Sequence, residues 1–215
     1  GRVFPYDLRI GLHLEQALLL SNNWQKEDEY FAIGVQGGLE RKNANFSPNK
    51  GYFILGGIDS YLSQEITRYS AKMGLYIPIN KDNTVVAVQI RGSTQNEGFT
   101  HNYHQLSIHG IDGVRSPFHQ DMLGNAILQI NSELRIDIVE KALMFMDTFQ
   151  GIVFVDWGLA GLDWKKIDSG RTSQFAIGTG LRFYFGAPLF IPMRLEIGWD
   201  RKGSPQFFFS GSKPF

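Results

Sequence analysis

The chain has 215 residues, and its 21 basic and 21 acidic side chains cancel to a net charge of zero. This balance argues against a nucleic-acid-binding protein, which would need a positive surface to meet phosphates. The sequence contains no cysteine, which excludes disulfide frameworks and thiolate metal sites. Aromatic residues at 13% and 24 glycines fit a membrane β-barrel, where aromatics form interfacial girdles and glycines let strands bend.

Neither a membrane-spanning helix nor a signal peptide is visible in the sequence. No apolar run approaches the roughly 20 residues that a spanning helix needs. The chain also does not start with a positively charged segment followed by an apolar stretch, as a signal peptide does. Because an exported protein carries such a peptide at synthesis, we expect the sequence that begins at Gly1 to be a mature form or a fragment.

Segments in which apolar and polar residues alternate follow one another along the whole chain. Such alternation points apolar side chains to one face of a strand and polar side chains to the other. It is visible over residues 8–15, 31–36, 68–75, 86–91, 128–138, 177–185 and 193–200. The pattern predicts an all-β protein, a transmembrane antiparallel β-barrel with about ten strands in this chain. A soluble sandwich with its polar faces outward is the alternative.

The connections between these segments differ in length. Residues 80–83 and 203–205 have the composition of tight polar turns. The segment 98–125 is much longer, contains glycine, histidine and proline, and shows no alternation. Loops of that length are usually either functional or disordered.

Four blocks in order resemble the BamA/TamA-like bacterial surface-antigen superfamily of outer-membrane assembly factors and translocases. Phe46–Tyr52 is similar to the family's F-P-x-x-G turn, and His109–Phe118 to its G-G-x-x-x-V-R-G-F loop block. Ile130–Arg135 and Phe154–Gly158 resemble two strand motifs of the family. Gly180–Phe183 and the terminal residues resemble its final strands. This chain departs from the loop pattern at two places: His109 stands at the first glycine, and Ser116-Pro117 follows the arginine.

The resemblance implies that residues 1–215 are the C-terminal barrel domain, with about ten of the family's sixteen strands. On this interpretation the N-terminal strands and the POTRA domains lie outside the chain. Either the chain is a fragment, or it is an abbreviated member that closes as a smaller barrel or with a second chain. An open sheet edge in lipid would leave unpaired backbone groups that each cost several kcal/mol, which favours the fragment.

The family's loop arginine reaches into the barrel lumen and pairs with acids on two neighbouring strands. The matching residues here are Arg115, Glu133 and Asp156. Alternation agrees, because it places Glu133 and Asp156 on the polar faces of their strands. Gly158 lies beside Asp156 and leaves room for an incoming side chain. A guanidinium can form bidentate hydrogen bonds with carboxylates, which a lysine cannot reproduce.

The end of the chain resembles the family's assembly signal and its lateral seam. Phe207, Phe209 and Phe215 share one face of the last strand, and a terminal aromatic is typical of a transmembrane β-barrel. Near the same end, Gly211, Ser212 and Pro214 predict a seam that pairs poorly, since proline lacks a donor and glycine weakens pairing. An incoming strand could pair with this edge by β-augmentation.

Two other chemical interpretations of the long loop are weak. His101, His104 and His109 suggest a metal site, but structural zinc needs four well-placed ligands. Ser107, His104 and Asp112 include the residue types of a catalytic triad, but a triad is recognised by geometry rather than by proximity in sequence. We therefore expect no catalytic residue, no metal and no cofactor in this chain.

The resemblance implies a non-enzymatic insertase or translocase in the outer membrane of a Gram-negative cell. Its partners would be outer-membrane lipid and lipopolysaccharide, unfolded outer-membrane or secreted proteins, and accessory lipoproteins, with no nucleic acid. Two alternatives remain open. The barrel could anchor or deliver an upstream enzyme such as a patatin-like phospholipase, or the chain could be a stand-alone lipid hydrolase that uses the loop histidines.

Overall fold

The computed structural model describes residues 7–20, 27–43, 48–61, 66–80, 83–96, 105–143, 146–164, 173–185 and 191–211. Ten strands in this part of the chain form one sheet in the order β1-β2-β3-β4-β5-β8-β9-β10-β11-β12. Their bounds are β1 Asp7–Leu20, β2 Glu27–Lys42, β3 Gly51–Tyr61, β4 Ile66–Asn80, β5 Thr84–Gln95, β8 Ala126–Leu143, β9 Met146–Gly161, β10 Ser173–Phe185, β11 Pro192–Trp199 and β12 Pro205–Ser210.

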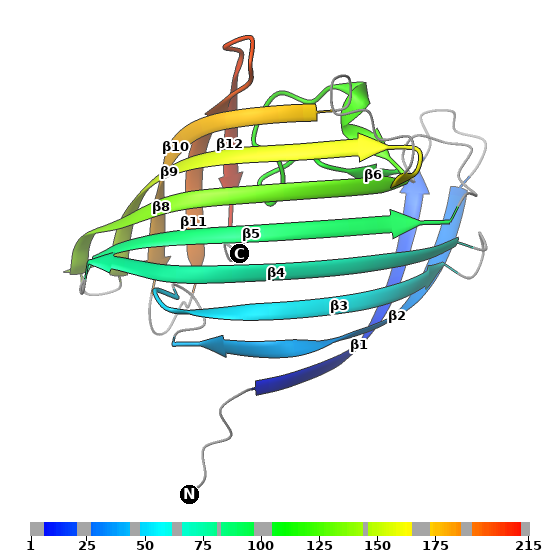
Figure 1. The fold of residues 1–215 in the computed structure, drawn as a ribbon, viewed down its shortest axis with the longest axis horizontal. Helices are drawn as coiled ribbons and strands as arrows, with labels where there is room; N and C mark the ends of the chain where they lie inside the picture. The colour runs from blue at the N-terminus through cyan, green and yellow to red at the C-terminus, as the bar shows by residue number, and fades with distance from the viewer. Residues whose placement is uncertain are drawn as a thin grey trace, which may run out of the picture.

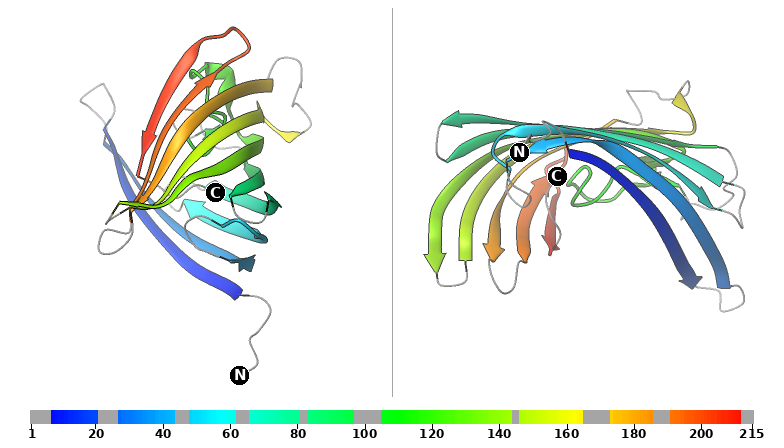
Figure 2. Two further views of the ribbon diagram at one scale, coloured as in Figure 1. Left: turned by 90° about the vertical axis from the view of Figure 1, so that its left-hand side faces the viewer. Right: turned by 90° about the horizontal axis from the view of Figure 1, so that it is seen from below.

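Each strand pairs antiparallel with its neighbours in the sheet. Sequential strands are adjacent throughout, and the only excursion within the described residues is the long connection from β5 to β8. The sheet is strongly curved, with β1 and β12 at its two ends and the β5–β8 connection on its concave side (Figures 1 and 2). The expectation of an all-β antiparallel fold with about ten strands is confirmed.

The sheet is apolar on its outer, convex face and polar on its inner, concave face. Val153 and Val155 of β9 are 49% and 40% exposed, whereas the next residue, Asp156, is fully buried. Large apolar side chains are exposed on the outer face along the rest of the sheet as well. They are Ile33, Val35, Leu39, Ile54, Ile58, Tyr69, Met73, Leu75, Ile77, Ile136, Ile138, Ile177, Leu181 and Leu195. A water-soluble sandwich would bury such a surface, so this face is suited to lipid.

The β5–β8 connection contains two short strands, β6 Leu106–Ser107 and β7 Leu123–Gly124, and the 3₁₀ turn η2 Gln120–Met122. The strands β6 and β7 pair with each other. A small apolar core holds this connection against the concave face, and it consists of Leu106, Ile108, Val114, Met122, Ile127, Ala160 and Ala176. Burial of these side chains fixes the loop inside the curve of the sheet.

The two tight turns of the sequence pattern fall between paired strands. Strands β11 and β12 are joined by a turn in which Asp200 accepts hydrogen bonds from the backbone N–H groups of Lys202 and Ser204 at 2.9 and 2.8 Å. Gly203 in this turn has φ +77°, a conformation that favours glycine. Strands β4 and β5 pair up to Asn80 and Thr84, while Lys81 and Asp82 lie outside the described residues.

Among the described residues, no helix has the length and apolar character that a membrane crossing requires.

A charge on the outer face should destabilise the folded sheet in lipid. Val153 lies near the middle of β9, where arginine facing the hydrocarbon costs about 2–4 kcal/mol. We expect Val153→Arg to lower the urea midpoint of the protein folded in lipid vesicles, measured by heat-modifiable migration in electrophoresis. The matched control Val153→Leu should unfold at nearly the wild-type midpoint. Equal stability of the arginine variant would contradict the assignment of this face to lipid.

Candidate functional site

Charged side chains from four neighbouring strands converge on the concave face under the long loop. The alternation of β8 directs Glu133 inward, that of β9 directs Asp156 inward, and that of β11 directs Glu196 inward. The exposed fractions of these residues are 2%, 0% and 3%. Arg115 descends from the β5–β8 connection into this group of carboxylates and is itself fully buried.

The guanidinium of Arg115 contacts all three carboxylates. Its Nε and Nη2 donate to the two oxygens of Asp156 at 2.7 and 2.8 Å, which is a bidentate pair. Its Nη1 donates to Glu133 at 2.8 Å and to Glu196 at 2.9 Å. Arg115 thereby uses four of the five N–H donors of a guanidinium, in a geometry that the single ammonium of lysine cannot copy.

The surroundings of Arg115 hold both its side chain and its backbone in place. The guanidinium carbon lies 3.5 Å from the centre of the Phe154 ring, a cation–π contact. The backbone N–H of Arg115 donates to Asp156 at 3.1 Å. Asn131 of β8 bridges the loop and the strands, because its side-chain amide donates to the carbonyl of Gly113 at 2.7 Å and to Asp156 at 2.9 Å.

Three further arginines surround the same carboxylates. Arg182 of β10 donates to Glu133 at 2.6 Å and to Glu196 at 2.9 Å. Arg135 contacts Glu133 at 2.8 Å, and Arg194 contacts Glu196 at 3.0 Å. We call this group the arginine network, which consists of Arg115, Arg135, Arg182, Arg194, Glu133, Asp156 and Glu196. It joins the loop to β8, β9, β10 and β11.

Burial and the neighbouring carboxylates act in opposite directions on Arg115. Burial alone lowers the pKa of its guanidinium, but Asp156, Glu133 and Glu196 raise that pKa well above the usual value. Arg115 therefore stays charged. A buried ion pair adds little net stability when complete, but removal of one partner leaves an uncompensated buried charge. The network is therefore a strong constraint on where the loop can sit.

Two glycines let the loop approach the strands closely. A Cβ on Gly198 of β11 would lie 1.9 Å from the backbone oxygen of Arg115. A Cβ on Gly158 of β9 would lie 2.8 Å from the side chain of Val114. The space that Gly158 leaves is thus taken by the residue before the arginine, while the guanidinium itself lies over Asp156 and Phe154.

Comparisons with known proteins identify the family and the fold of the chain. The family model described as the Omp85 superfamily domain matches residues 12–215. The chain belongs to the Omp85 superfamily. Its members are outer-membrane proteins of Gram-negative bacteria and form a superfamily of protein assembly and translocation factors. The search of proteins with curated function returned no match.

Among solved structures, the chain resembles BamA from Haemophilus ducreyi lacking POTRA domains 1-3. The TM-score is 0.60 at 16% sequence identity, with 86% of this chain and 42% of the BamA chain covered. This likeness concerns the fold alone, a large curved antiparallel sheet like that of the BamA barrel. The chain spans less than half the length of that structure.

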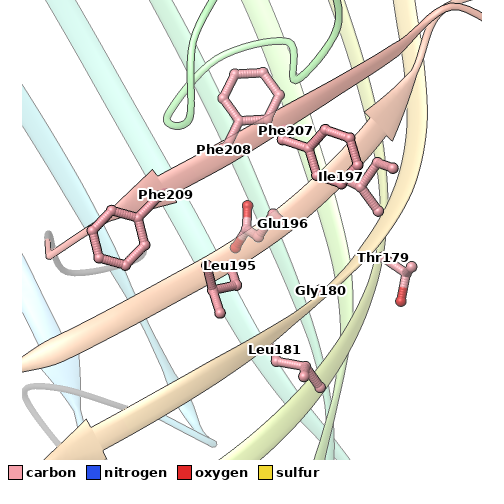
Figure 3. A pocket seen from close by; sticks show the side chains of 9 residues that line it. All are labelled: Thr179, Gly180, Leu181, Leu195, Glu196, Ile197, Phe207, Phe208 and Phe209. Carbon is pink, nitrogen blue, oxygen red and sulfur yellow. The ribbon is translucent and has the colours of Figure 1, made fainter.

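The last strand of this Omp85 sheet carries the aromatic residues of the expected assembly signal. Phe207 and Phe209 point outward and are 74% and 66% exposed. They border a groove of about 510 Å³ on the outer face of β10, β11 and β12, whose side walls include Leu181, Leu195 and Ile197 (Figure 3). Gly211 directly follows β12, while Ser212, Pro214 and Phe215 lie outside the described residues.

Among the described residues, the structure shows no arrangement that supports a metal site or a catalytic triad in the loop. His101 and His104 lie outside the described residues. The Ser107 hydroxyl accepts a hydrogen bond from the backbone N–H of His109 at 3.0 Å, and Asp112 pairs with Arg194 at 2.9 Å. Within the described part of the chain, no three histidine or acidic side chains are grouped as metal ligands would be.

Sequence reasoning named Arg115, Glu133 and Asp156 but missed several of their partners. Arg182, Arg194 and Glu196 carried one available signal, which is that alternation puts all three on the polar face of consecutive strands. Whether these side chains contact one another depends on the register between the strands, which the sequence of one strand does not determine. In the structure Arg182 lies directly opposite Arg194, and Glu196 provides the carboxylate between them.

Replacement of Arg115 tests the constraint that the network places on the loop. Arg115→Ala leaves Asp156 without its guanidinium partner, and such a loss costs about 3–5 kcal/mol at a buried pair. We expect lower stability in urea and faster proteolysis within residues 105–125 of the folded protein. Arg115→Lys should rescue only part of both effects because lysine lacks the fork. Full rescue by lysine would show that charge alone seats the loop.

A glycine replacement tests the close approach of the loop without changing any charge. Gly198→Ala places a methyl group 1.9 Å from the Arg115 carbonyl oxygen, so the loop backbone must move. We expect increased protease sensitivity of residues 105–125, similar in direction to Arg115→Ala. Gly92→Ala is the matched control, because the nearest atom to its Cβ would be 3.9 Å away. Equal protection of both alanine variants would contradict this contact.

Proposed function

We propose that this chain is the membrane-embedded barrel portion of an outer-membrane protein that inserts other proteins into the membrane or moves them across it. Membership of the Omp85 superfamily supports the general class. The observation that carries the proposal is the arginine network, which holds a long loop inside the concave face through Arg115. A sheet that served only as a membrane anchor would not need a buried charge cluster to position a loop within it.

In this proposal the loop and the end of the sheet work together. The network holds the loop against β8, β9, β10 and β11, next to the short terminal strand β12. In the sequence Gly211, Ser212 and Pro214 follow Ser210, and they would form the weak part of a lateral seam. A client strand would pair with that edge by β-augmentation, with backbone hydrogen bonds supplying the affinity.

The proposed partners follow from the two surfaces of the sheet. Outer-membrane lipid and lipopolysaccharide would contact the apolar convex face, and Phe207, Phe209 and Phe215 would form the signal by which the barrel itself is assembled. Unfolded outer-membrane or secreted proteins would be the clients, and accessory lipoproteins would assist from the periplasm. The localisation is the outer membrane of a Gram-negative cell. No catalytic residue and no cofactor take part.

The proposal is tested with the full-length protein reconstituted into lipid vesicles. Folding of an added unfolded outer-membrane barrel is followed by its heat-modifiable migration, and an exported soluble protein is followed by protease protection. We expect Arg115→Ala to slow one of these two reactions by about tenfold, which corresponds to about 1.4 kcal/mol. The rates are normalised to the amount of folded protein in the vesicles.

Arg201→Ala is the matched control, because Arg201 lies exposed in the β11–β12 turn, outside the arginine network, and donates to Ser173 at 3.4 Å. It should retain the wild-type rates. If the wild-type protein accelerates neither reaction, the assembly and translocation function is wrong. If both arginine variants are equally active, the network has no part in that function.

A further inference from the structure

The terminal strand β12 is held to the sheet by few contacts of its own. It has six residues and forms six residue pairs with β11, from Arg194 opposite Ser210 to Trp199 opposite Pro205. Two of its side chains, Phe207 and Phe209, point away from the concave face. Anything that fixes the inner side of β11 and β12 therefore has a large influence on whether this last pairing forms.

The loop grips β11 through Arg194. The side chain of Arg194 is fully buried and points into the concave face, opposite the last paired residue of β12. Its Nη1 donates to Asp112 at 2.9 Å, and its Nη2 donates to the carbonyl of Ile111 at 3.1 Å. Both acceptors belong to the loop, so the loop and the penultimate strand are joined by two hydrogen bonds from one guanidinium.

Asp112 adds a carboxylate to the arginine network. The network as defined above consists of four arginines and three carboxylates. Glu196 is shared by Arg115, Arg182 and Arg194. Asp112 supplies a further carboxylate to Arg194, from a side chain that is 51% exposed at the loop surface.

The same short stretch of the loop contacts β12 directly. The ring of His109 contacts two aromatic rings, with centroid distances of 5.5 Å to Phe118 and 6.0 Å to Phe208. Phe208 shares the inner face of β12 with Gln206 and Ser210, and the loop passes beside it (Figure 3).

We propose that residues 109–112 form a clamp that holds β11 and β12 together from inside the curve of the sheet. Asp112 acts on β11 through Arg194, and His109 acts on β12 through Phe208. Both are positioning residues. Release of the clamp weakens the β11–β12 pairing and exposes the edge at which a client strand would add. The clamp rests on the proposed function only for this last use, because the contacts and their effect on pairing are independent of any client.

Amide hydrogen exchange of the full-length protein in lipid nanodiscs tests the clamp directly. Asp112→Ala and His109→Ala alter a part-exposed and a half-buried loop residue, so the barrel should still fold. We expect amides of residues 206–210 to exchange about tenfold faster in Asp112→Ala, and about threefold faster in His109→Ala, than in the wild type. Amides in the centre of β8 should keep their wild-type rates.

Asp121→Ala is the matched control from the same loop. Asp121 is exposed and accepts a hydrogen bond from Gln174 of β10 at 2.8 Å, so its loss removes a loop-to-strand contact that does not involve β11 or β12. We expect faster exchange only near residues 119–124 in this variant. If Asp112→Ala and His109→Ala also affect the loop alone, the clamp is wrong and the two contacts merely seat the loop.

A double-mutant cycle provides the second readout. If His109 acts through Phe208, His109→Ala should change the exchange of β12 less in a Phe208→Leu background than in the wild type. Equal effects in both backgrounds would overturn that arm of the clamp. The exchange measurement needs no client, so its outcome is separate from the assembly test. A protein without assembly activity can have the clamp, and an active one can be shown to lack it.

Discussion

The buried guanidinium of Arg115 is the interaction on which the arrangement of this sheet and its loop depends. A charge inside a protein is tolerated only when carboxylates and hydrogen-bond acceptors surround it, and here they come from β8, β9 and β11. Those strands must therefore keep their register, since a slip by one residue would turn each acid to the opposite face. The loop and the strands fix each other.

The inverted distribution of polarity gives this charge cluster its setting. The convex face is apolar and suited to lipid, so polar side chains collect on the concave face. The inner face holds fully buried Arg182 and Arg194, which would be rare in the core of a soluble protein. Loop residues such as Ile108 and Val114 form a small apolar core with residues of β8, β9 and β10.

The period-two pattern was enough to predict the antiparallel sheet and the faces of its strands, because side-chain direction in a strand follows from position alone. Arg115, Glu133 and Asp156 came from resemblance in their sequence blocks, and they lie in contact. Arg182, Arg194 and Glu196 were visible only as polar-face residues. Their grouping depends on cross-strand register and on the path of the loop, and neither follows from local sequence. The role of Gly198 was hidden for the same reason.

The position of Asp112 shows how a local loop contact reaches the end of the sheet. Arg194 shares the carboxylate of Glu196 with Arg115 and Arg182. The second carboxylate that it contacts, Asp112, is therefore an important part of its electrostatic environment. Because Arg194 lies opposite Ser210, a movement of Arg194 acts at the end of β12, the shortest strand of the main sheet. Electrostatics inside the curve and backbone pairing at its edge are thus one coupled system.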